Sequence, residues 1–314
     1  MASMPTSARS APQLVAQGLK LDMSPGSLGQ LRSSTDILEN TGALRDRMAK
    51  DGYLHLPGYL DRELVLEARR SVTDRLAEEG LTDPNHPPED AVAPPGSGLK
   101  FQPDLAHDNE PLHRLLYDGR MMEFYERFLG GPVRHYDFTW MRAVAPGHGT
   151  HPHGDVVFMG RGTHDLYTAW TPLGDADYEL GGLMILEGSH RLQYLRRGYL
   201  TRDVDEYCEN VPGEEEHAQT DSTMHGWRWD GRLSDDPVEL REQLGGRWLT
   251  TEYRAGDLLT FSTYTIHASL DNRSNRIRLS SDSRYQLASD PIDERWIGEA
   301  PIGHGPAGKR GRIC

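Results

Sequence analysis

The stretch DLLTFSTYTIHASLDNRSNRIRLSSDSRY, residues 257–285, carries the pattern that decides the fold class. Its two ends, 257–262 and 276–285, have the length and composition of short β-strands, and the Asp and Asn residues between them favour turns. Segments of the same kind recur upstream at 166–170, 182–186 and 247–253. Residues from 133 to the Pro146-Gly147 turn alternate in polarity, which predicts one further strand.

The amino-terminal part has a helical pattern instead. After Asp61, a good N-cap residue, Val65, Ala68, Val72 and Leu76 recur at spacings of three and four, which predicts a helix ending at Gly80. Further helices are expected near 44–52 and 111–129, with a short strand at 53–56 between the first two. Helices ahead of many short strands predict an all-β core of barrel or double-sheet type with flanking helices.

We expect one domain over residues 37–300. Residues 1–36 are rich in Ser, Gly and Pro without apolar periodicity, so they are predicted to form a loosely ordered arm. Residues 301–314 are predicted to be a carboxy-terminal tail. A long polar stretch at about 191–246 is expected as an insertion between core strands, either covering a site or forming a solvated acidic surface.

The composition excludes several classes of function. The net charge of -14, from 34 basic and 48 acidic residues, disfavours binding to nucleic acid or to anionic membrane surfaces. No stretch has the apolar length of a secretory signal or a membrane span. Only Cys208 and Cys314 occur, so we expect neither a disulfide framework nor a four-cysteine metal site, and a reducing, cytoplasmic setting. The oligomeric state cannot be predicted.

One short motif and one distant residue form a candidate metal site. His153 and Asp155 flank Gly154, and on a strand both side chains would point to the same face. His267 follows far downstream, in strand context. Two imidazoles and one carboxylate on one face of an octahedral ion are the ligand set of non-heme Fe(II) oxygenases. The sequence therefore predicts an iron site at His153, Asp155 and His267.

Other interpretations of these histidines are weaker. His151 alternates onto the same face as His153 and could replace one ligand, although Pro152 makes a place at the rim more plausible. His148 and His164 lie in Gly-rich or turn-like surroundings. A cupin site would have a glutamate a few residues after its histidines, where this chain has Val157. A tetrahedral zinc hydrolase could use the same three ligands.

An arginine at a fixed distance separates the iron and zinc hypotheses. Arg278 follows His267 by eleven residues, and a guanidinium binds a carboxylate bidentately. This suits the distal carboxylate of 2-oxoglutarate, whose keto acid end would chelate Fe(II). A zinc hydrolase has no need for such a residue. Arg276 shares the predicted strand face, so the spacing favours Arg278 without excluding Arg276.

Over roughly residues 45–287 the chain resembles the phytanoyl-CoA dioxygenase family. The resemblance rests on HPHGD around His153, on Thr168-Ala169-Trp170, Gly181-Gly182-Leu183, Glu187-Gly188-Ser189-His190 and Gly256-Asp257-Leu258-Leu259-Thr260-Phe261, and on His267-Ala268-Ser269. It departs at Glu187, where the family often has proline. It implies a double-stranded β-helix (jelly roll, cupin-like) with amino-terminal helices packed on the major sheet. It also implies Fe(II), 2-oxoglutarate and O2 as cofactors and cosubstrates.

The resemblance assigns further roles. Ser269 would assist Arg278, Trp170 would line the cosubstrate pocket, and Lys100 would lie near the cosubstrate or be structural. Asp155 is retained, whereas related halogenases lose it, so hydroxylation of an unactivated C–H bond is expected, with 2-oxoglutarate converted to succinate and CO2. The substrate would be a small or medium-sized metabolite. Candidate substrate residues are Gln102, Tyr136, Trp140, Arg142 and Arg161.

Two alternatives remain open at this stage. The chain could be a metalloenzyme of another kind, such as a zinc-type hydrolase, that ignores 2-oxoglutarate. It could also be a non-catalytic binding module on the same scaffold, which we would expect to have lost a ligand or the arginine. All of these residues are present.

Overall fold

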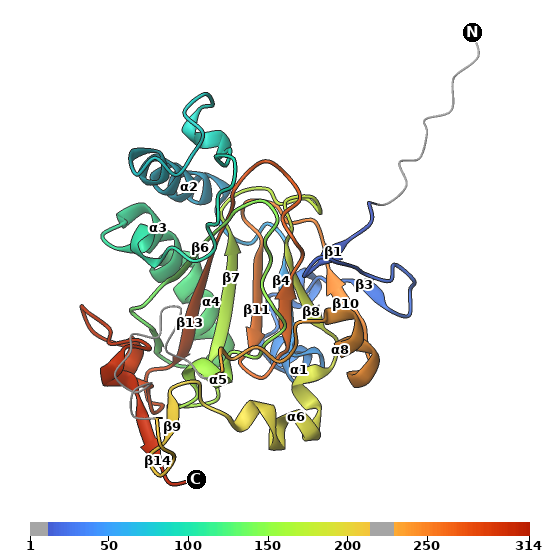
Figure 1. Ribbon diagram of the computed structural model, residues 1–314, viewed down its shortest axis with the longest axis vertical. Coiled ribbons are helices and arrows are strands. Elements are labelled where there is room, and N and C mark those ends of the chain that lie inside the picture. Colours follow the sequence, from blue (N-terminus) through green and yellow to red (C-terminus); the bar gives the residue numbers. More distant parts are fainter. Residues whose placement is uncertain (1–11, 214–228) are drawn as a thin grey trace.

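The structure, a computed structural model, describes residues 12–213 and 229–314. Within these residues the largest sheet has six strands in the order β4-β11-β7-β13-β5, with β6 also paired to β13. Its strands are β4 (Tyr53–Leu56), β5 (Val133–His135), β6 (Trp140–Val144), β7 (Tyr167–Pro172), β11 (Leu258–Ser262) and β13 (Arg278–Leu287). Figure 1 shows β13, β7, β11 and β4 as a central row.

A smaller sheet faces this one. Its order is β12-β8-β10-β3, formed by β12 (His267–Ser269), β8 (Leu183–Leu186), β10 (Trp248–Thr250) and β3 (Leu28–Gln30). Tyr53, Trp170 and Phe261 from the large sheet share one buried apolar cluster with Ile185 and Leu249 from the small sheet. The two sheets therefore enclose a common core, and the predicted double-sheet, jelly-roll architecture is confirmed.

Helices cover the outer face of the large sheet. They are α1 (Thr41–Asp51), α2 (Arg62–Glu78), α3 (Glu110–Tyr117) and α4 (Gly119–Leu129). Val65 and Phe124 from these helices pack in one cluster with Met141 and Leu258 of the sheet. The Asp61 side chain accepts hydrogen bonds from the first backbone N–H groups of α2, as its N-cap position predicted. Both faces of the large sheet are thus buried.

The predicted loose arm over residues 1–36 is wrong from residue 12 onward. β1 (Val15–Ala16) pairs with β2 (Leu19–Lys20), and β3 adds a parallel strand to β10. Leu14 and Leu31 are buried. Strand pairing uses backbone groups, so a Gly- and Ser-rich segment can join a sheet without an alternating side-chain pattern. Residues 1–11 lie outside the described part of the chain.

The single strand predicted after residue 133 is interrupted. β5 and β6 both pair with β13, but residues 136–139 leave the ladder between them. There the N–H groups of Asp137 and Phe138 donate to the carbonyl of Trp296. The interruption therefore ties this edge of the sheet to the carboxy-terminal part of the chain.

The predicted insertion and tail belong to the folded body. The insertion contains α6 (Gln193–Arg197), β9 (Glu206–Cys208) and α8 (Pro237–Leu244), and its residues 214–228 lie outside the described chain. β14 (Arg310–Arg312) pairs in parallel with β9. Buried Asp205 receives an ion pair from Lys309, 3.0 Å away, and a contact from His304 at 2.7 Å. Residues 301–314, which we expected to form a carboxy-terminal tail, are thus packed against the domain.

The two cysteines are joined. Cys208 and Cys314 form a disulfide across 106 residues of sequence, with their Cα atoms 5.5 Å apart. We expected no disulfide framework and a reducing setting. One disulfide is present, so the cysteine content no longer argues for a reducing setting. Among the described helices none has the length and apolarity needed to span a membrane.

Candidate metal and cosubstrate site

His153 and His267 meet as a hydrogen-bonded pair. The two residues form an isolated antiparallel bridge, with His153 N–H donating to His267 O at 3.0 Å and His267 N–H donating to His153 O at 2.9 Å. Their imidazole centroids lie 4.2 Å apart, and both side chains are buried. Backbone pairing thus brings together two residues that are far apart in the sequence.

Each imidazole has its Nδ1 atom engaged by the backbone. His153 Nδ1 lies 2.8 Å from the carbonyl of His151, and His267 Nδ1 lies 3.0 Å from the carbonyl of Thr265. A carbonyl can only accept, so both Nδ1 atoms carry the proton in the neutral rings. The two Nε2 lone pairs remain for a metal, which is the usual way in which a second hydrogen bond fixes a ligand tautomer.

Asp155 does not lie on a strand, contrary to the prediction. The chain turns at Gly154, and Asp155 directly precedes the short helix α5 (Val156–Met159), whose first N–H donates to Thr263 O. A Cβ atom at Gly154 would lie 2.6 Å from Leu200 Cδ2, so the position has no room for a side chain. The turn, instead of strand parity, aims Asp155 toward the histidines.

The two oxygens of Asp155 have different surroundings. Oδ2 accepts a hydrogen bond from Thr168 Oγ1 at 2.5 Å and pairs with Arg284 Nη2 at 3.1 Å. Oδ1 faces His153 Nε2 at 3.6 Å and His267 Nε2 at 3.7 Å. Burial alone would raise the pKa of Asp155, but Arg284 and the two imidazoles outweigh it and hold this pKa well below its usual value.

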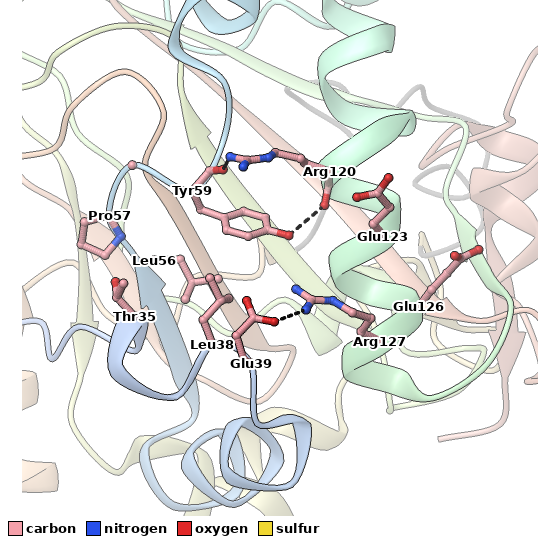
Figure 2. A pocket seen from close by; sticks show the side chains of 11 residues that line it. Thr35, Leu38, Glu39, Leu56, Pro57, Tyr59, Arg120, Glu123, Glu126 and Arg127 are labelled. Atoms are coloured by element: carbon pink, nitrogen blue, oxygen red, sulfur yellow. Dashed lines mark hydrogen bonds and ion pairs between the residues drawn. The ribbon is translucent and has the colours of Figure 1, made fainter.

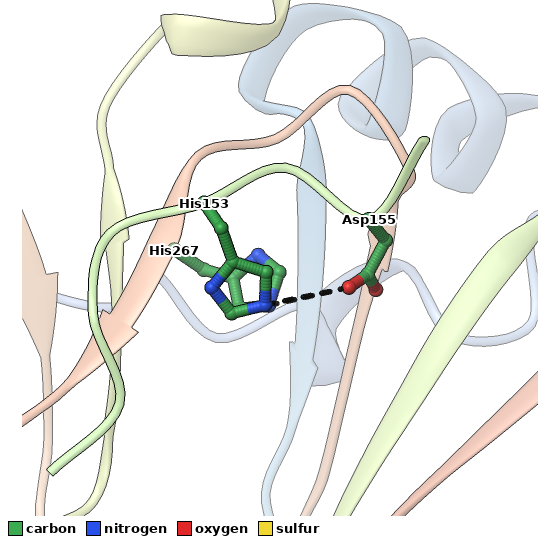
Figure 3. Close-up of side chains that lie close together, drawn as sticks. All are labelled: His153, Asp155 and His267. Carbon is green, nitrogen blue, oxygen red and sulfur yellow. Dashed lines mark ion pairs between the residues drawn. The ribbon is translucent and has the colours of Figure 1, made fainter. Parts of the chain in front are cut away.

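The three side chains fit one metal ion. Their ligand atoms all lie within 4.8 Å of one another, and Figure 3 shows them converging on a common point. Ligands at about 2.1 Å on adjacent corners of an octahedron are ~3 Å apart, so a small contraction would complete the set. His151 is not part of this cluster, because its Nδ1 lies 3.3 Å from Asp235.

Arg278 is an enclosed cation at the start of β13. It begins β13 with 1% of its surface exposed, and its three guanidinium nitrogens have no hydrogen-bond partner among the described residues. Burial, and then the nearby Arg142, lower the pKa of Arg278 to about 10, so the group stays charged at neutral pH. An unpaired buried charge is costly, so this site is built for an anion.

Arg276 occupies a different place. It is half-buried, precedes β13, and forms an isolated bridge with Val92 on the helical side of the sheet. Its charge also lowers the pKa of Arg69 on α2, after the larger effect of burial. Of these two arginines, only Arg278 is enclosed.

The other expected cosubstrate residues differ in burial. Ser269, on β12 just beyond His267, is fully buried, and its Oγ accepts from Thr150 N–H at 2.8 Å. Trp170 is also fully buried, and its indole Nε1 has no partner among the described residues. Lys100 is exposed and lines the cavity described next. Two polar groups near the core and one at the surface are thus available.

A cavity of about 540 Å³ opens onto the metal cluster. His153 and Asp155 line it together with aromatic, apolar and charged side chains. The aromatic and apolar lining residues are Phe101, Pro103, Phe138, Trp140, Val144, Phe158, Met159, Trp296, Pro301 and Ile302. This size and lining are typical of a site for a small or medium-sized molecule.

Two of the five predicted substrate residues line this cavity. Trp140 and Arg142 do, and Arg142 is paired with Asp282 at 2.6 Å. Three do not. Gln102 lies in a separate surface hollow, Tyr136 is fully buried behind the wall, and Arg161 is bound to Asp203 at 2.6 Å. Their positions in the sequence gave no measure of how deeply each side chain is buried.

Another hollow, of about 600 Å³, lies away from the metal cluster. Figure 2 shows it between the segment after β4 and helix α4. Both of its arginines have partners: Arg127 pairs with Glu39 at 3.1 Å, and Arg120 Nη1 donates to the carbonyl of Tyr59 at 2.6 Å. It shares no residue with the cluster of His153, Asp155 and His267. We interpret it as a surface groove.

Sequence reasoning missed several residues at the site. Arg284 and Thr168 contact Asp155, and their only signal was parity with Arg278 and Trp170 on their strands. Trp296 and the 301–305 segment wall the cavity from the carboxy-terminal end, for which no pattern existed. Asp230 and Arg232, from the predicted insertion, also line it.

Two hydroxylases are similar to this chain over most of its length. The 1-deoxypentalenic acid 11-beta-hydroxylase of Streptomyces exfoliatus is 27% identical over 281 residues, covering 81% of this chain and 86% of that protein. The enzyme of the same name from Streptomyces arenae is 27% identical over 280 residues.

Solved structures share the fold. The non-heme carbocyclase SnoK from nogalamycin biosynthesis matches with a TM-score of 0.56 at 19% identity, covering 81% of this chain and 88% of that one. EctD from S. alaskensis, solved with 2-oxoglutarate and 5-hydroxyectoine, matches with a TM-score of 0.54 at 16% identity over 98% of both chains.

The family model described as phytanoyl-CoA dioxygenase matches residues 48–280, well over half of the chain. It spans the three converging ligands and the enclosed arginine. Together with the hydroxylase relatives, this decides between the hypotheses left open by the sequence. The chain belongs to the phytanoyl-CoA dioxygenase family and is an Fe(II)/2-oxoglutarate-dependent oxygenase.

Proposed function

We propose that this protein hydroxylates an unactivated C–H bond of a small or medium-sized metabolite. His153, Asp155 and His267 would hold Fe(II), and Arg278 would bind the distal carboxylate of 2-oxoglutarate. The observation that carries the proposal is the enclosed guanidinium of Arg278, whose three nitrogens lack partners among the described residues. A carboxylate group, such as the distal one of 2-oxoglutarate, is a ligand that such a fork binds bidentately.

The chemistry and the protein have separate tasks. Bound iron and 2-oxoglutarate would supply the oxidation, with one oxygen atom of O2 ending in succinate, formed with CO2 from 2-oxoglutarate, and the other in the hydroxylated product. The two imidazoles present their Nε2 atoms, because Nδ1 of each is held by a backbone carbonyl. Ser269 and Trp170 would support the cosubstrate, and Lys100 would offer a cation at the cavity rim.

The cavity suggests what kind of substrate fits. Several aromatic side chains line it. The arginines that line it already have acidic partners: Arg142 has Asp282 at 2.6 Å, Arg284 has Asp155 at 3.1 Å, and Arg232 has Asp230. We infer a mainly apolar skeleton, contacted by Trp140. The named substrate of the Streptomyces relatives is an acid, and a carboxylate on such a skeleton could meet Lys100. Membrane and nucleic-acid partners are not part of the proposal.

The disulfide bears on the location of the protein in the cell. The expected cytoplasmic location rested on the absence of a disulfide, and the Cys208–Cys314 bond removes that support. We keep the location only as a proposal, to be tested by measuring the redox state of the two cysteines in cells.

A succinate-release assay tests the proposed function. The protein is loaded anaerobically with Fe(II) and 2-oxoglutarate and then exposed to O2, and succinate is measured with and without candidate substrates. Arg278→Ala and His153→Ala should abolish succinate release, whereas Arg276→Ala, a matched arginine outside the enclosed site, should retain it. Succinate release that needs neither iron nor 2-oxoglutarate would contradict the proposal. Mass spectrometry for a product heavier by one oxygen atom then distinguishes hydroxylation from another oxidation.

A further inference from the structure

Asp155 is held from behind by two residues of neighbouring strands. Thr168 on β7 and Arg284 on β13 are directly paired in the antiparallel register of the large sheet. Both reach the same oxygen, Oδ2, at 2.5 Å and 3.1 Å. Because strand partners have fixed spacing, the two donors form one rigid unit that meets the carboxylate at a single oxygen.

The guanidinium of Arg284 is itself fixed. It has 1% of its surface exposed, it lies over the Trp140 ring with Cζ 4.6 Å from the centroid, and its Nε–H donates to Met159 Sδ at 3.1 Å. A planar group held by a stack and two directed contacts has little freedom to rotate. Arg284 can therefore define the orientation of the carboxylate and not merely follow it.

The clamp leaves the two oxygens with different roles. Oδ2 has two donors, while Oδ1 points at the two Nε2 atoms, 3.6 Å and 3.7 Å away. A carboxylate free to rotate could offer both oxygens to an ion and take up a position that other ligands need. We propose that Thr168 and Arg284 are positioning residues. They would make Asp155 bind the metal ion through one oxygen and so keep the ion's remaining coordination positions open.

This inference rests on the proposed metal site but can fail independently of the proposed reaction. Its test uses Co(II), a divalent ion that does not start oxygen chemistry, bound to the full chain and titrated by calorimetry and visible absorption. Outer-shell partners of metal ligands typically contribute 10–100-fold to metal affinity. Thr168→Val should weaken Co(II) binding by about this factor and change the visible spectrum, because a second carboxylate oxygen changes the coordination number.

Matched variants separate positioning from general packing. Thr171→Val removes a buried hydroxyl from the same strand, one that has no hydrogen-bond partner among the described residues, and should leave Co(II) affinity unchanged. Thr168→Ser keeps the donor and should restore affinity and spectrum. Arg284→Lys keeps the charge but loses the planar stack, and should show the altered spectrum even if its affinity is partly retained.

The possible outcomes are distinct. Thr168→Val with the affinity and spectrum of the wild type would overturn the clamp, and so would equal losses in Thr168→Val and Thr171→Val. If the wild type binds Co(II) but no 2-oxoglutarate, the proposed reaction fails, while a selective loss in Thr168→Val still supports the clamp. If the wild type binds no Co(II) at all, both proposals are overturned.

Discussion

The inner face of β13 carries two buried arginines whose situations are opposite. Arg284, near the metal cluster, is paired with Asp155 at 3.1 Å. Arg278, six residues earlier on the same face, has three nitrogens without partners among the described residues. Both have 1% of their surface exposed. Equal burial with unequal pairing shows that burial alone does not reveal a ligand site, whereas an unmet charge does.

The unfolding free energy of the metal-free, ligand-free protein should separate the two arginines most strongly. Arg284→Met leaves the buried Asp155 carboxylate without its cation, which should lower the free energy of unfolding by about 3–5 kcal/mol. Arg278→Met removes a buried charge that has no hydrogen-bond partner among the described residues, so it should be neutral or stabilising. Denaturant unfolding of both variants measures this. Equal destabilisation by the two changes would break the comparison.

Cosubstrate binding should reverse this order. Arg278→Met should weaken 2-oxoglutarate binding to the Co(II)-loaded protein by about 2–5 kcal/mol, because the dicarboxylate loses its charged partner. In the wild type, 2-oxoglutarate at a hundred times its Kd should stabilise the fold by about 2.7 kcal/mol. Anaerobic calorimetry and thermal melts provide both values, with Arg276→Met as the control. Undiminished affinity in Arg278→Met would place the cosubstrate elsewhere.

The disulfide tests whether local chemistry and global stability can be separated. Cys314→Ser should lower the free energy of unfolding by about 2–4 kcal/mol, since the bond closes a long loop. It contacts neither arginine, so Co(II) and 2-oxoglutarate affinities should stay within twofold of the wild type. Denaturant unfolding with and without reductant measures the first effect. A large loss of cosubstrate affinity would show that the tail acts on the site directly.

Gly154 sharpens the comparison at the metal end. Gly154→Ala places a methyl group 2.6 Å from Leu200 Cδ2, and such overpacking typically costs about 1–3 kcal/mol. The strain falls between His153 and Asp155, so Co(II) affinity should fall as well. Gly42→Ala in α1 is the control, because a Cβ there would lie 3.4 Å from Asn40 Oδ1, an ordinary contact. Unchanged metal binding in Gly154→Ala would mean that the turn adapts.

The parts of this site that could be predicted are those with local signals. The His153-Gly154-Asp155 motif and His267 converge as expected. The spacing of eleven residues from His267 favoured Arg278 over Arg276, and Arg278 is the one that is enclosed. Parity could also have indicated Arg284, but a positively charged residue in a strand suggests exposure unless its partner is known. The pairing with Asp155 crosses 129 residues, a separation that no local pattern encodes.

The regions that could not be predicted are held by backbone pairing and by buried charges. β3 and β14 are short strands from segments without alternation, and each joins a partner far away in the sequence. Asp205, in the acidic insertion, is buried and pairs with Arg295 at 2.5 Å and with Lys309 at 3.0 Å. Composition describes the average environment of a segment, and these few residues depart from that average because distant partners compensate them.

The position of Trp140 has a consequence for how substrate entry could be detected. One face of this indole supports the guanidinium that steadies Asp155, and the ring also forms part of the cavity wall. A molecule that displaces the ring would therefore also displace Arg284, and through it the proposed metal ligand Asp155. The fluorescence of Trp140 should therefore change both when a molecule occupies the cavity and when a metal ion binds.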